Sequence, residues 1–380
     1  MIYFLEDFSQ IGFGGGQRFT AEIISLLSKF FLNSTVLHMG SRDLFVKNLA
    51  LMPEYSLSLT YRMISADSGL PSRFRYLFSI SRLIWFNNAS YFLSCTRFTT
   101  LCLIFSVALS PFSKEKNTYI LFHHLHPPSH PFVRFLYAQA FKANHFISIF
   151  PSQYLLNLYK DTFFLKHRSF VSPTPDIHFP HASSKLPLKE ICSNIHLFPP
   201  ADLSFLYVGM VHPEKGIFQL IKYLSYVYSK CSKLSFALSI YGTGPFQMTD
   251  IICNLIPTLP FPVSYYGHVE VTSTLYSRAS CLIVPSWYRP ETLCFTAIEG
   301  IKYCNRNFFA RCGVLKDYQK FKHVTMIDDN LQTFSDCMLS FIDTYSKDPI
   351  SSESNQELEN FNCDQRDTFD SFWFNLCTAS

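Results

Sequence analysis

Charged residues are scarce in this sequence: Asp, Glu, Lys and Arg make up 16% of its 380 residues, against 48% hydrophobic residues. A chain that stays disordered needs the opposite balance, so the composition predicts a globular protein. The net charge is only +4 and no block of five or six like charges is present, which argues against nucleic acid as a partner. Because a single hydrophobic core usually stops growing near this length, we expect two domains of similar size.

Three further absences bear on location. The 12 cysteines include no Cys-x-x-Cys pair, and a chain this long does not depend on disulfides, so we expect reduced thiols in a cytoplasmic protein. Glu6 and Asp7 lie where a secretion signal would be basic and then apolar, so we expect no secretion. The uncharged interval over residues 98–113 is shorter than the roughly 20 apolar residues that span a bilayer, and we expect no transmembrane helix.

Short apolar runs alternate with segments of helical periodicity, a pattern typical of β-α units on a parallel sheet. The expected strands are residues 2–5, 34–39, 56–61, 118–123, 145–149 and 169–173 in the first half and 204–209, 236–242, 263–267 and 281–286 in the second. A Pro- and Ser-rich stretch, residues 172–187, separates the two series. The sequence therefore predicts an α/β protein with Rossmann-like domains over residues 1–190 and 191–355. Residues 356–380 are expected to include a helix that packs back on the body.

Three loops after expected strands carry residues suited to a ligand with phosphate and sugar groups. Residues 12–18, Gly-Phe-Gly-Gly-Gly-Gln-Arg, follow the first strand, where backbone amides can face an anion, although a tight turn explains them equally well. Lys215 lies between a strand and a helix, where parallel sheets hold phosphate, unless it is a solvated surface lysine. Glu291 and Glu299 are eight residues apart across a loop-to-helix junction. They could accept hydrogen bonds from sugar and ribose hydroxyls, or be two exposed helix acids.

In this order and spacing, the loops resemble those of glycosyltransferase family 4. The matching segments are the loop Gly209–Gly216, the Tyr-Gly-Thr-Gly-Pro run at 241–245 and the Glu-x7-Glu spacing that begins at Glu291. Residues 14–17 and 122–124 match more loosely, and the resemblance is good over residues 200–315. It implies the GT-B fold, in which two Rossmann-like domains face each other across a cleft. The N-terminal domain would bind the acceptor and the C-terminal domain the nucleotide-sugar donor.

The resemblance also implies roles for single residues. Lys215 would bind the donor diphosphate, Glu299 the ribose and Glu291 the transferred sugar. A histidine at the end of an N-terminal strand would lie beside the donor sugar, and residues 123, 124 and 126 are all histidine. The residues expected to be catalytic are His123, His124 and Glu291. The residues expected to bind the donor are Gly15, Gly16, Gly209, Lys215, Gly244, Glu291, Thr292, Leu293 and Glu299.

The sequence departs from the family pattern at three positions. Met210 stands where arginine usually follows the glycine, Cys294 replaces a usual glycine, and Gly300 replaces the alanine that usually follows the second glutamate. Losing one charge-assisted hydrogen bond to phosphate costs about 1.5–3 kcal/mol unless another cation, such as Arg18 or Arg289, takes its place. The departures are compatible with low activity or an unusual donor.

On this basis we expect a retaining glycosyltransferase that transfers a sugar from a nucleotide-diphosphate sugar to a saccharide or lipid-linked acceptor, in surface polysaccharide or glycolipid synthesis. No Asp-x-Asp motif is present, so we expect no metal and no other cofactor. Met210 and Cys294 favour an alternative, a non-catalytic GT-B-like subunit that binds and stabilises an active glycosyltransferase. An epimerase or phosphorylase on the same fold is a further alternative.

Residues 73–86 predict an amphipathic helix that could contact a membrane. Helical periodicity puts Arg75, Ser79 and Arg82 on one face. The expected apolar face holds Phe74, Leu77, Phe78, Ile84 and Trp85. Such a helix can lie in a membrane interface, which would place the protein in peripheral contact with the inner face of the membrane, or it can pack on the sheet of a Rossmann domain.

Overall fold

The computed structural model describes residues 2–8, 20, 23, 24, 27, 34–40, 59–65, 70–86, 91–109, 117–143, 145–165, 168–172, 201–231, 234–269, 273–347 and 368–376. The chain divides into two compact units. Unit 1 comprises Met1–Asp176 and Cys363–Ser380, and unit 2 comprises Ile177–Asn362. The boundaries expected after residues 190 and 355 fall outside the described residues and stay predictions.

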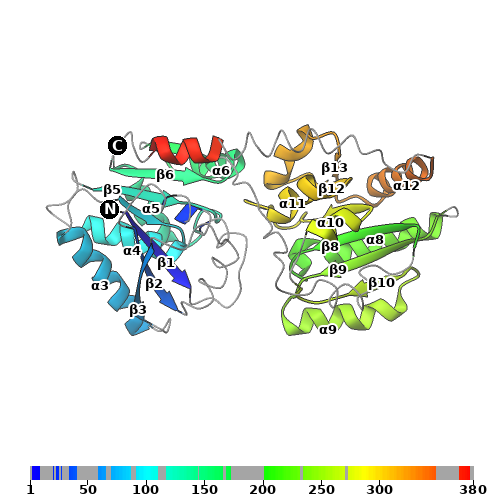
Figure 1. Cartoon of the computed structure of the whole chain (residues 1–380), viewed down its shortest axis with the longest axis horizontal. Coiled ribbons are helices and arrows are strands. Elements are labelled where there is room, and N and C mark those ends of the chain that lie inside the picture. Colours follow the sequence, from blue (N-terminus) through cyan, green and yellow to red (C-terminus); the bar gives the residue numbers. More distant parts are fainter. Residues whose placement is uncertain are drawn as a thin grey trace. The chain divides into compact units, whose positions relative to one another are not determined.

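Unit 1 is built on a parallel sheet, in which the described residues form seven strands (Figure 1). The strands are β1 (Ile2–Phe8), β2 (Ser34–Gly40), β3 (Leu59–Ser65), β4 (Tyr91–Ser94), β5 (Thr118–Phe122), β6 (Phe146–Phe150) and β7 (Arg168–Val171). Their order in the sheet is β3-β2-β1-β4-β5-β6-β7. β1 pairs with β2 on one side and with β4 on the other, so the direction of winding reverses there, as in a Rossmann domain.

Four helices cover one face of this sheet: α3 (Leu70–Phe86), α4 (Arg97–Ala108), α5 (Pro131–Ala140) and α6 (Gln153–Thr162). They share one core with alternate strand residues such as Tyr3, Leu5 and Phe92. α4 begins with a capping box between Thr96 and Thr99. The start of α4 is therefore fixed at the carboxyl end of β4.

The predicted division of α3 into a basic face and an apolar face was wrong. The helix buries Ser72, Tyr76, Ile80, Ser81 and Ile84 against the rest of unit 1. Phe74, Phe78 and Trp85 are exposed, as are Arg75 and Arg82. The buried positions centre between the two predicted faces, so the apolar pattern of this helix does not by itself indicate the side that packs on the sheet.

The C-terminal helix, residues 368–376, belongs to unit 1. Trp373 is fully buried, and its Nε1 donates a hydrogen bond to the Ser172 hydroxyl at 3.2 Å. Phe372 lies edge-on to Phe170 of β7, with 6.2 Å between the ring centroids. These contacts hold the helix against β7, the edge strand of the sheet, and the residue that follows it.

Unit 2 has a second parallel sheet, with six strands among the described residues. They are β8 (Leu203–Val208), β9 (Phe236–Tyr241), β10 (Val263–Tyr265), β11 (Cys281–Val284), β12 (Asn307–Ala310) and β13 (Val324–Ile327), in the order β10-β9-β8-β11-β12-β13. The helices are α8 (Ile217–Lys230), α9 (Phe246–Leu255), α10 (Ser273–Arg278), α11 (Phe295–Tyr303) and α12 (Leu331–Lys347), with 3-10 turns η2 (Pro213–Lys215), η3 (Ile256–Thr258) and η4 (Gly313–Lys320). Both faces are covered: Phe205 and Ile283 belong to one core cluster, and their neighbours Leu206 and Leu282 to the other.

The predicted class, α/β with two Rossmann-like domains, is confirmed. The sequence missed β4, a four-residue strand, together with β12 and β13. Among the described helices, none combines the length and apolar character that crossing a bilayer requires. The nine cysteines among the described residues are all free.

Candidate functional site

The topology of unit 2 determines where a ligand can bind. In doubly wound sheets, ligands bind beyond the carboxyl ends of the strands, where the strand order reverses. In unit 2 this point lies between β8 and β11, which pair in parallel. The loops that follow these two strands, residues 209–216 and 285–294, therefore border the candidate site.

Lys215 is positioned at this edge of the sheet by a tight turn that requires glycine at the next residue, Gly216. η2 begins at Pro213, and Gly216 ends it in the left-handed conformation with φ 73°. A Cβ at Gly216 would overlap the carbonyl oxygen of Pro285. The loop after β8 can therefore approach the end of β11 only with glycine at this position.

Lys215 and Glu291 form an ion pair at the carboxyl edge of the sheet. The Lys215 Nζ donates to Glu291 Oε1 at 2.5 Å, and the Ser286 hydroxyl donates to the same oxygen at 2.9 Å. The two charged side chains are 22% and 16% exposed, so the pair lies at the surface without being fully solvated. No described residue donates a hydrogen bond to the second carboxylate oxygen, Glu291 Oε2. The ammonium keeps further protons and the carboxylate a second oxygen for a ligand.

The start of η4, which follows β12, also supports Glu291. The backbone N–H of Val314 donates to the Glu291 carbonyl at 2.9 Å, and Gly313, with φ 56°, passes close to the Glu291 backbone. Glu291 is thus positioned by loops from β8, β11 and β12. Sequence reasoning missed Ser286 and Gly313 as site residues; a polar or glycine residue just after a buried strand is the signal that could have identified them.

Few of the described positively charged side chains lie where the donor diphosphate is expected to bind. Met210 is exposed, and its side chain offers no charge where the family has arginine. Arg289 lies on the loop after β11, but its guanidinium donates to Glu214 Oε2 at 2.9 Å. Arg18 lies outside the described residues. Lys215 is therefore the predicted cation that the structure places at the reversal point.

Glu299 is buried on α11, within reach of a tyrosine. The Tyr276 hydroxyl donates to Glu299 Oε2 at 2.6 Å, and both side chains are buried. A Cβ at the neighbouring Gly300 would overlap the end of the Leu282 side chain and lie 2.5 Å from Asn307 Oδ1, so an alanine there would require both side-chain ends to move. The ribose-binding role of Glu299 stays a prediction.

The remaining predicted residues of unit 2 lie in the same loops. Thr292 and Leu293 are half-buried between Glu291 and α11, whose N-cap is Cys294. Burial raises the pKa of the Cys294 thiol, with the Glu291 charge as a second cause, so this cysteine is not a thiolate nucleophile. Gly244 passes so close to Val211 that only glycine fits.

Gly209 and the loop after β9 are also tightly joined. The Gly209 N–H donates to the Tyr241 carbonyl at 2.9 Å, and a Cβ at Gly242 would overlap the Gly209 carbonyl oxygen. The glycines of this edge therefore let neighbouring loops touch. Gly15 and Gly16 lie outside the described residues, and their roles stay predictions.

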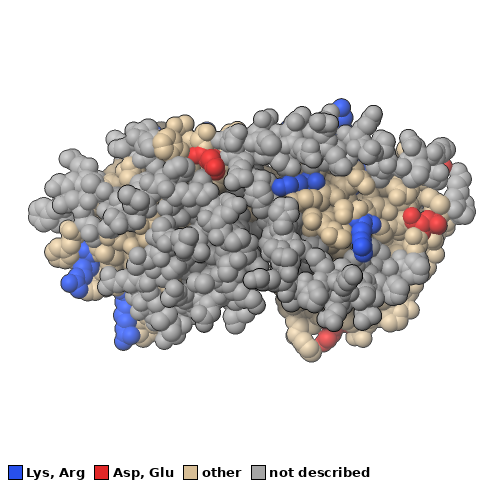
Figure 2. Space-filling view, viewed as in Figure 1, with Lys and Arg blue, Asp and Glu red and all other residues tan. Residues whose placement is uncertain are grey.

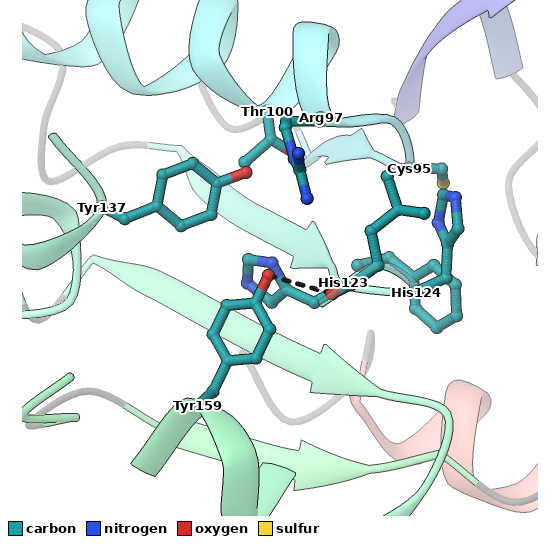
Figure 3. A pocket seen from close by; sticks show the side chains of 9 residues that line it. Cys95, Arg97, Thr100, His123, His124, Tyr137 and Tyr159 are labelled. Atoms are coloured by element: carbon teal, nitrogen blue, oxygen red, sulfur yellow. Dashed lines mark hydrogen bonds between the residues drawn. The ribbon is translucent and has the colours of Figure 1, made fainter. Parts of the chain in front are cut away.

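Unit 1 has a small polar pocket at the carboxyl end of β5 (Figure 3). Its enclosed space is about that of one water molecule. Arg97 and Thr100 of α4, Tyr137 of α5 and Tyr159 of α6 point toward it from three helices. The full lining is Cys95, Arg97, Thr100, Phe122, His123, His124, Leu125, Tyr137 and Tyr159.

The two predicted catalytic histidines have different surroundings. His123 is almost fully buried; its Nε2 lies 3.0 Å from the Ser148 hydroxyl, and its ring stacks on Phe150. This packing favours a structural role. His124 is half-buried, and burial together with the Arg97 charge lowers its pKa to about 4, despite a hydrogen bond with the Cys95 backbone. At neutral pH it is therefore an uncharged imidazole.

Arg97 and the tyrosines of the pocket had no predicted role. The Arg97 guanidinium donates to the His126 carbonyl at 2.8 Å, and the Tyr159 hydroxyl donates to the Leu125 carbonyl at 3.3 Å. Burial raises the pKa of Tyr137 and Tyr159, so both hydroxyls stay protonated. No group of three or more His, Cys, Asp or Glu able to hold a metal is found in the described part of the chain. Metal independence stays a prediction.

Comparison with solved structures identifies the fold as the GT-B fold of glycosyltransferases. Anabaena HepE in complex with UDP superposes with a TM-score of 0.67 at 14% identity, covering 100% of this chain and 98% of that one. A glycosyltransferase from Rickettsia africae gives 0.71 at 12% identity, covering 100% and 97%. The lipopolysaccharide outer core galactosyltransferase WaaB, without ligand, gives 0.65 at 14% identity, covering 99% and 98%.

Sequence comparison adds no assignment. No protein-family model matches the chain, and no curated protein matches it. Identities of 12–14% to the solved structures show the fold alone. Membership of glycosyltransferase family 4 in particular stays a prediction.

Proposed function

We propose that this protein is a glycosyltransferase that moves a sugar from a nucleoside-diphosphate sugar to a saccharide or lipid-linked acceptor. The observation that carries the proposal is the Lys215, Ser286 and Glu291 cluster at the point in unit 2 where the strand order reverses. HepE has been solved with UDP and with UDP-glucose, and TarM of S. aureus with UDP and an α-GlcNAc-glycerol. These ligands support a nucleotide-sugar donor and a saccharide acceptor here.

In the proposed reaction an acceptor hydroxyl forms a bond with the anomeric carbon. The bond from that carbon to the diphosphate oxygen breaks, the electron pair leaves on the nucleoside diphosphate, and the proton of the acceptor hydroxyl passes to a diphosphate oxygen. The Lys215 ammonium offsets the charge that develops there, which in a partly dehydrated site is worth more than in water. Glu291 Oε2 can accept a hydrogen bond from a sugar hydroxyl while Oε1 stays paired with Lys215.

The finer points of the proposal come from the family resemblance. We infer transfer with retention of configuration, no requirement for a metal, and a place in surface polysaccharide or glycolipid synthesis at the inner face of a membrane. The neutral His124 can exchange hydrogen bonds with sugar hydroxyls without adding a charge. Glu299 is assigned to the ribose, where its carboxylate would accept hydrogen bonds from the two vicinal hydroxyls.

The proposal is tested by calorimetric titration of the protein with UDP, GDP and ADP, with and without EDTA. We expect one nucleotide to bind, with no effect of EDTA, and the corresponding nucleotide sugars to be hydrolysed slowly or transferred to added saccharides. Loss of binding in EDTA would contradict the metal-independent form of the proposal. Binding of none of the three nucleotides would contradict the donor site itself.

One observation keeps a non-catalytic role as the second candidate. Met210 leaves the loop after β8 with a single placed cation, Lys215, near the expected diphosphate. A subunit that only stabilises an active glycosyltransferase needs no bound nucleotide. Co-purification with an active partner, together with failure to bind any nucleotide, would favour this second function.

A further inference from the structure

The outer face of α3 displays large aromatic side chains that the described residues of unit 1 leave exposed. Phe74, Phe78, Trp85 and Phe86 are 63%, 66%, 44% and 75% exposed. At 3.6 residues per turn, Phe74, Phe78 and Trp85 lie above one another along the helix. Contiguous exposed apolar surface of this kind marks a site of interaction.

The same face is basic. Arg75 and Arg82 are exposed, are seven residues apart and therefore flank the aromatic line on one side. Figure 2 shows Lys or Arg side chains projecting at the end of unit 1 that α3 occupies. No acidic residue occurs in α3 itself, in α4, which packs beside it, or in α5, which packs against α4.

The charge pattern extends well beyond α3. Residues 68–160 contain five Arg and four Lys against a single Glu, a net charge of +8. The whole chain carries +4, so the remaining residues together carry −4. The positive charge is thus concentrated in the segment of the chain that includes α3 and its exposed aromatic side chains.

We propose that the α3 face, defined as Phe74, Arg75, Phe78, Arg82, Trp85 and Phe86, docks on an anionic lipid bilayer. Aromatic side chains with flanking arginines suit the membrane interface, where the rings enter the acyl boundary and the guanidinium groups meet lipid phosphates. The role of this docking rests on the proposed function: the α3 face would bring the enzyme to a lipid-linked acceptor.

Charge argues against a second copy of this chain as the occupant. A two-fold dimer through the α3 face would bring the same surface against itself. Arg75 and Arg82 of one copy would then face those of the other, with no carboxylate on that face to pair with them. An anionic bilayer supplies the opposite charge over the whole face.

The test is cosedimentation with sucrose-loaded vesicles. One set is pure phosphatidylcholine, and the other contains about one third phosphatidylglycerol, to supply the anionic surface potential. We expect the wild-type chain to pellet with the anionic vesicles only, and less so as salt rises, because surface charges are screened. Equal pelleting with both sets, or with neither, would overturn the proposal.

Matched variants assign the binding to the α3 face. Each basic residue near an anionic surface contributes about fivefold, so Arg75→Ala with Arg82→Ala should weaken the partition about 25-fold. Phe74→Ser with Phe78→Ser should weaken it as well. The controls are Arg278→Ala and Phe246→Ser in unit 2, where Phe246 is 80% exposed. If the controls weaken binding as much as the α3 variants, the α3 face is not the docking surface.

A second measurement does not depend on these variants. Trp85 fluorescence should shift to shorter wavelength when anionic vesicles are added, and Trp85→Phe should abolish the shift. A concentration-dependent dimer that Phe78→Ser dissociates would instead show that a second copy covers the face. Vesicle binding needs neither donor nor acceptor, so a chain that binds vesicles but transfers no sugar would contradict only the proposed function. A chain that transfers sugar but does not bind vesicles would contradict only this inference.

Discussion

Replacing Lys215 with alanine removes the ammonium that joins the loops after β8 and β11. Of its three N–H donors, one is used by Glu291 Oε1, which leaves two for diphosphate oxygens. Since one charge-assisted hydrogen bond is worth about 1.5–3 kcal/mol, the loss of one predicts about 10- to 150-fold weaker nucleotide binding. The assay is isothermal titration with whichever of UDP, GDP and ADP binds the wild-type protein, at one fixed salt concentration.

The effect of Lys215 must be separated from its support of Glu291. Glu291→Gln keeps the shape of the partner but removes its charge, and Lys222→Ala removes an exposed lysine from the following helix as a matched control. If Lys215 contacts the diphosphate, Lys215→Ala weakens binding by a similar factor with Glu291 or with Gln at position 291, and Lys222→Ala has no effect. Unchanged affinity in a folded Lys215→Ala protein would refute the assignment. A loss seen only with Glu291 present would show that Lys215 acts through the carboxylate.

Three further predictions concern stability. The pKa of His124 is lowered to about 4 in the folded protein, so protonation of this histidine favours the unfolded state. The neutral imidazole therefore contributes at most about 3 kcal/mol to the free energy of unfolding, fully above pH 6.5 and progressively less as the pH falls toward 4. Urea midpoints should therefore fall more steeply with acid in the wild type than in His124→Asn. Gly216→Ala should cost more stability than Gly267→Ala, although both have positive φ, because a Cβ overlaps Pro285 only at 216; equal thermal midpoints would contradict this. Tyr276→Phe removes the hydrogen bond from the Tyr276 hydroxyl to the buried Glu299 Oε2 and should cost about 1–3 kcal/mol in urea unfolding.

The amino-acid sequence by itself determined the class of fold. The alternation of apolar runs and helical segments predicted β8, β9 and β11 to within a residue or two at each end, because buried parallel strands read as continuous apolar runs. β4 was missed because a strand of only four residues, Tyr91–Ser94, carries too little pattern to separate it from the apolar helix that follows. Lys215 and Glu291 were selected from their places after strands.

Only the tertiary structure decided which of these residues meet. Lys215 and Glu291 are 76 residues apart, and the pairing of β8 with β11 brings their loops together. The sequence could not separate His123 from His124, because both directly follow the same strand; packing buries His123 beside Ser148 and leaves His124 half-buried. Likewise, the periodicity of residues 73–86 does not indicate which side of the helix the sheet covers. Local patterns fix local conformation, whereas exposure and contact depend on residues that are distant in the chain.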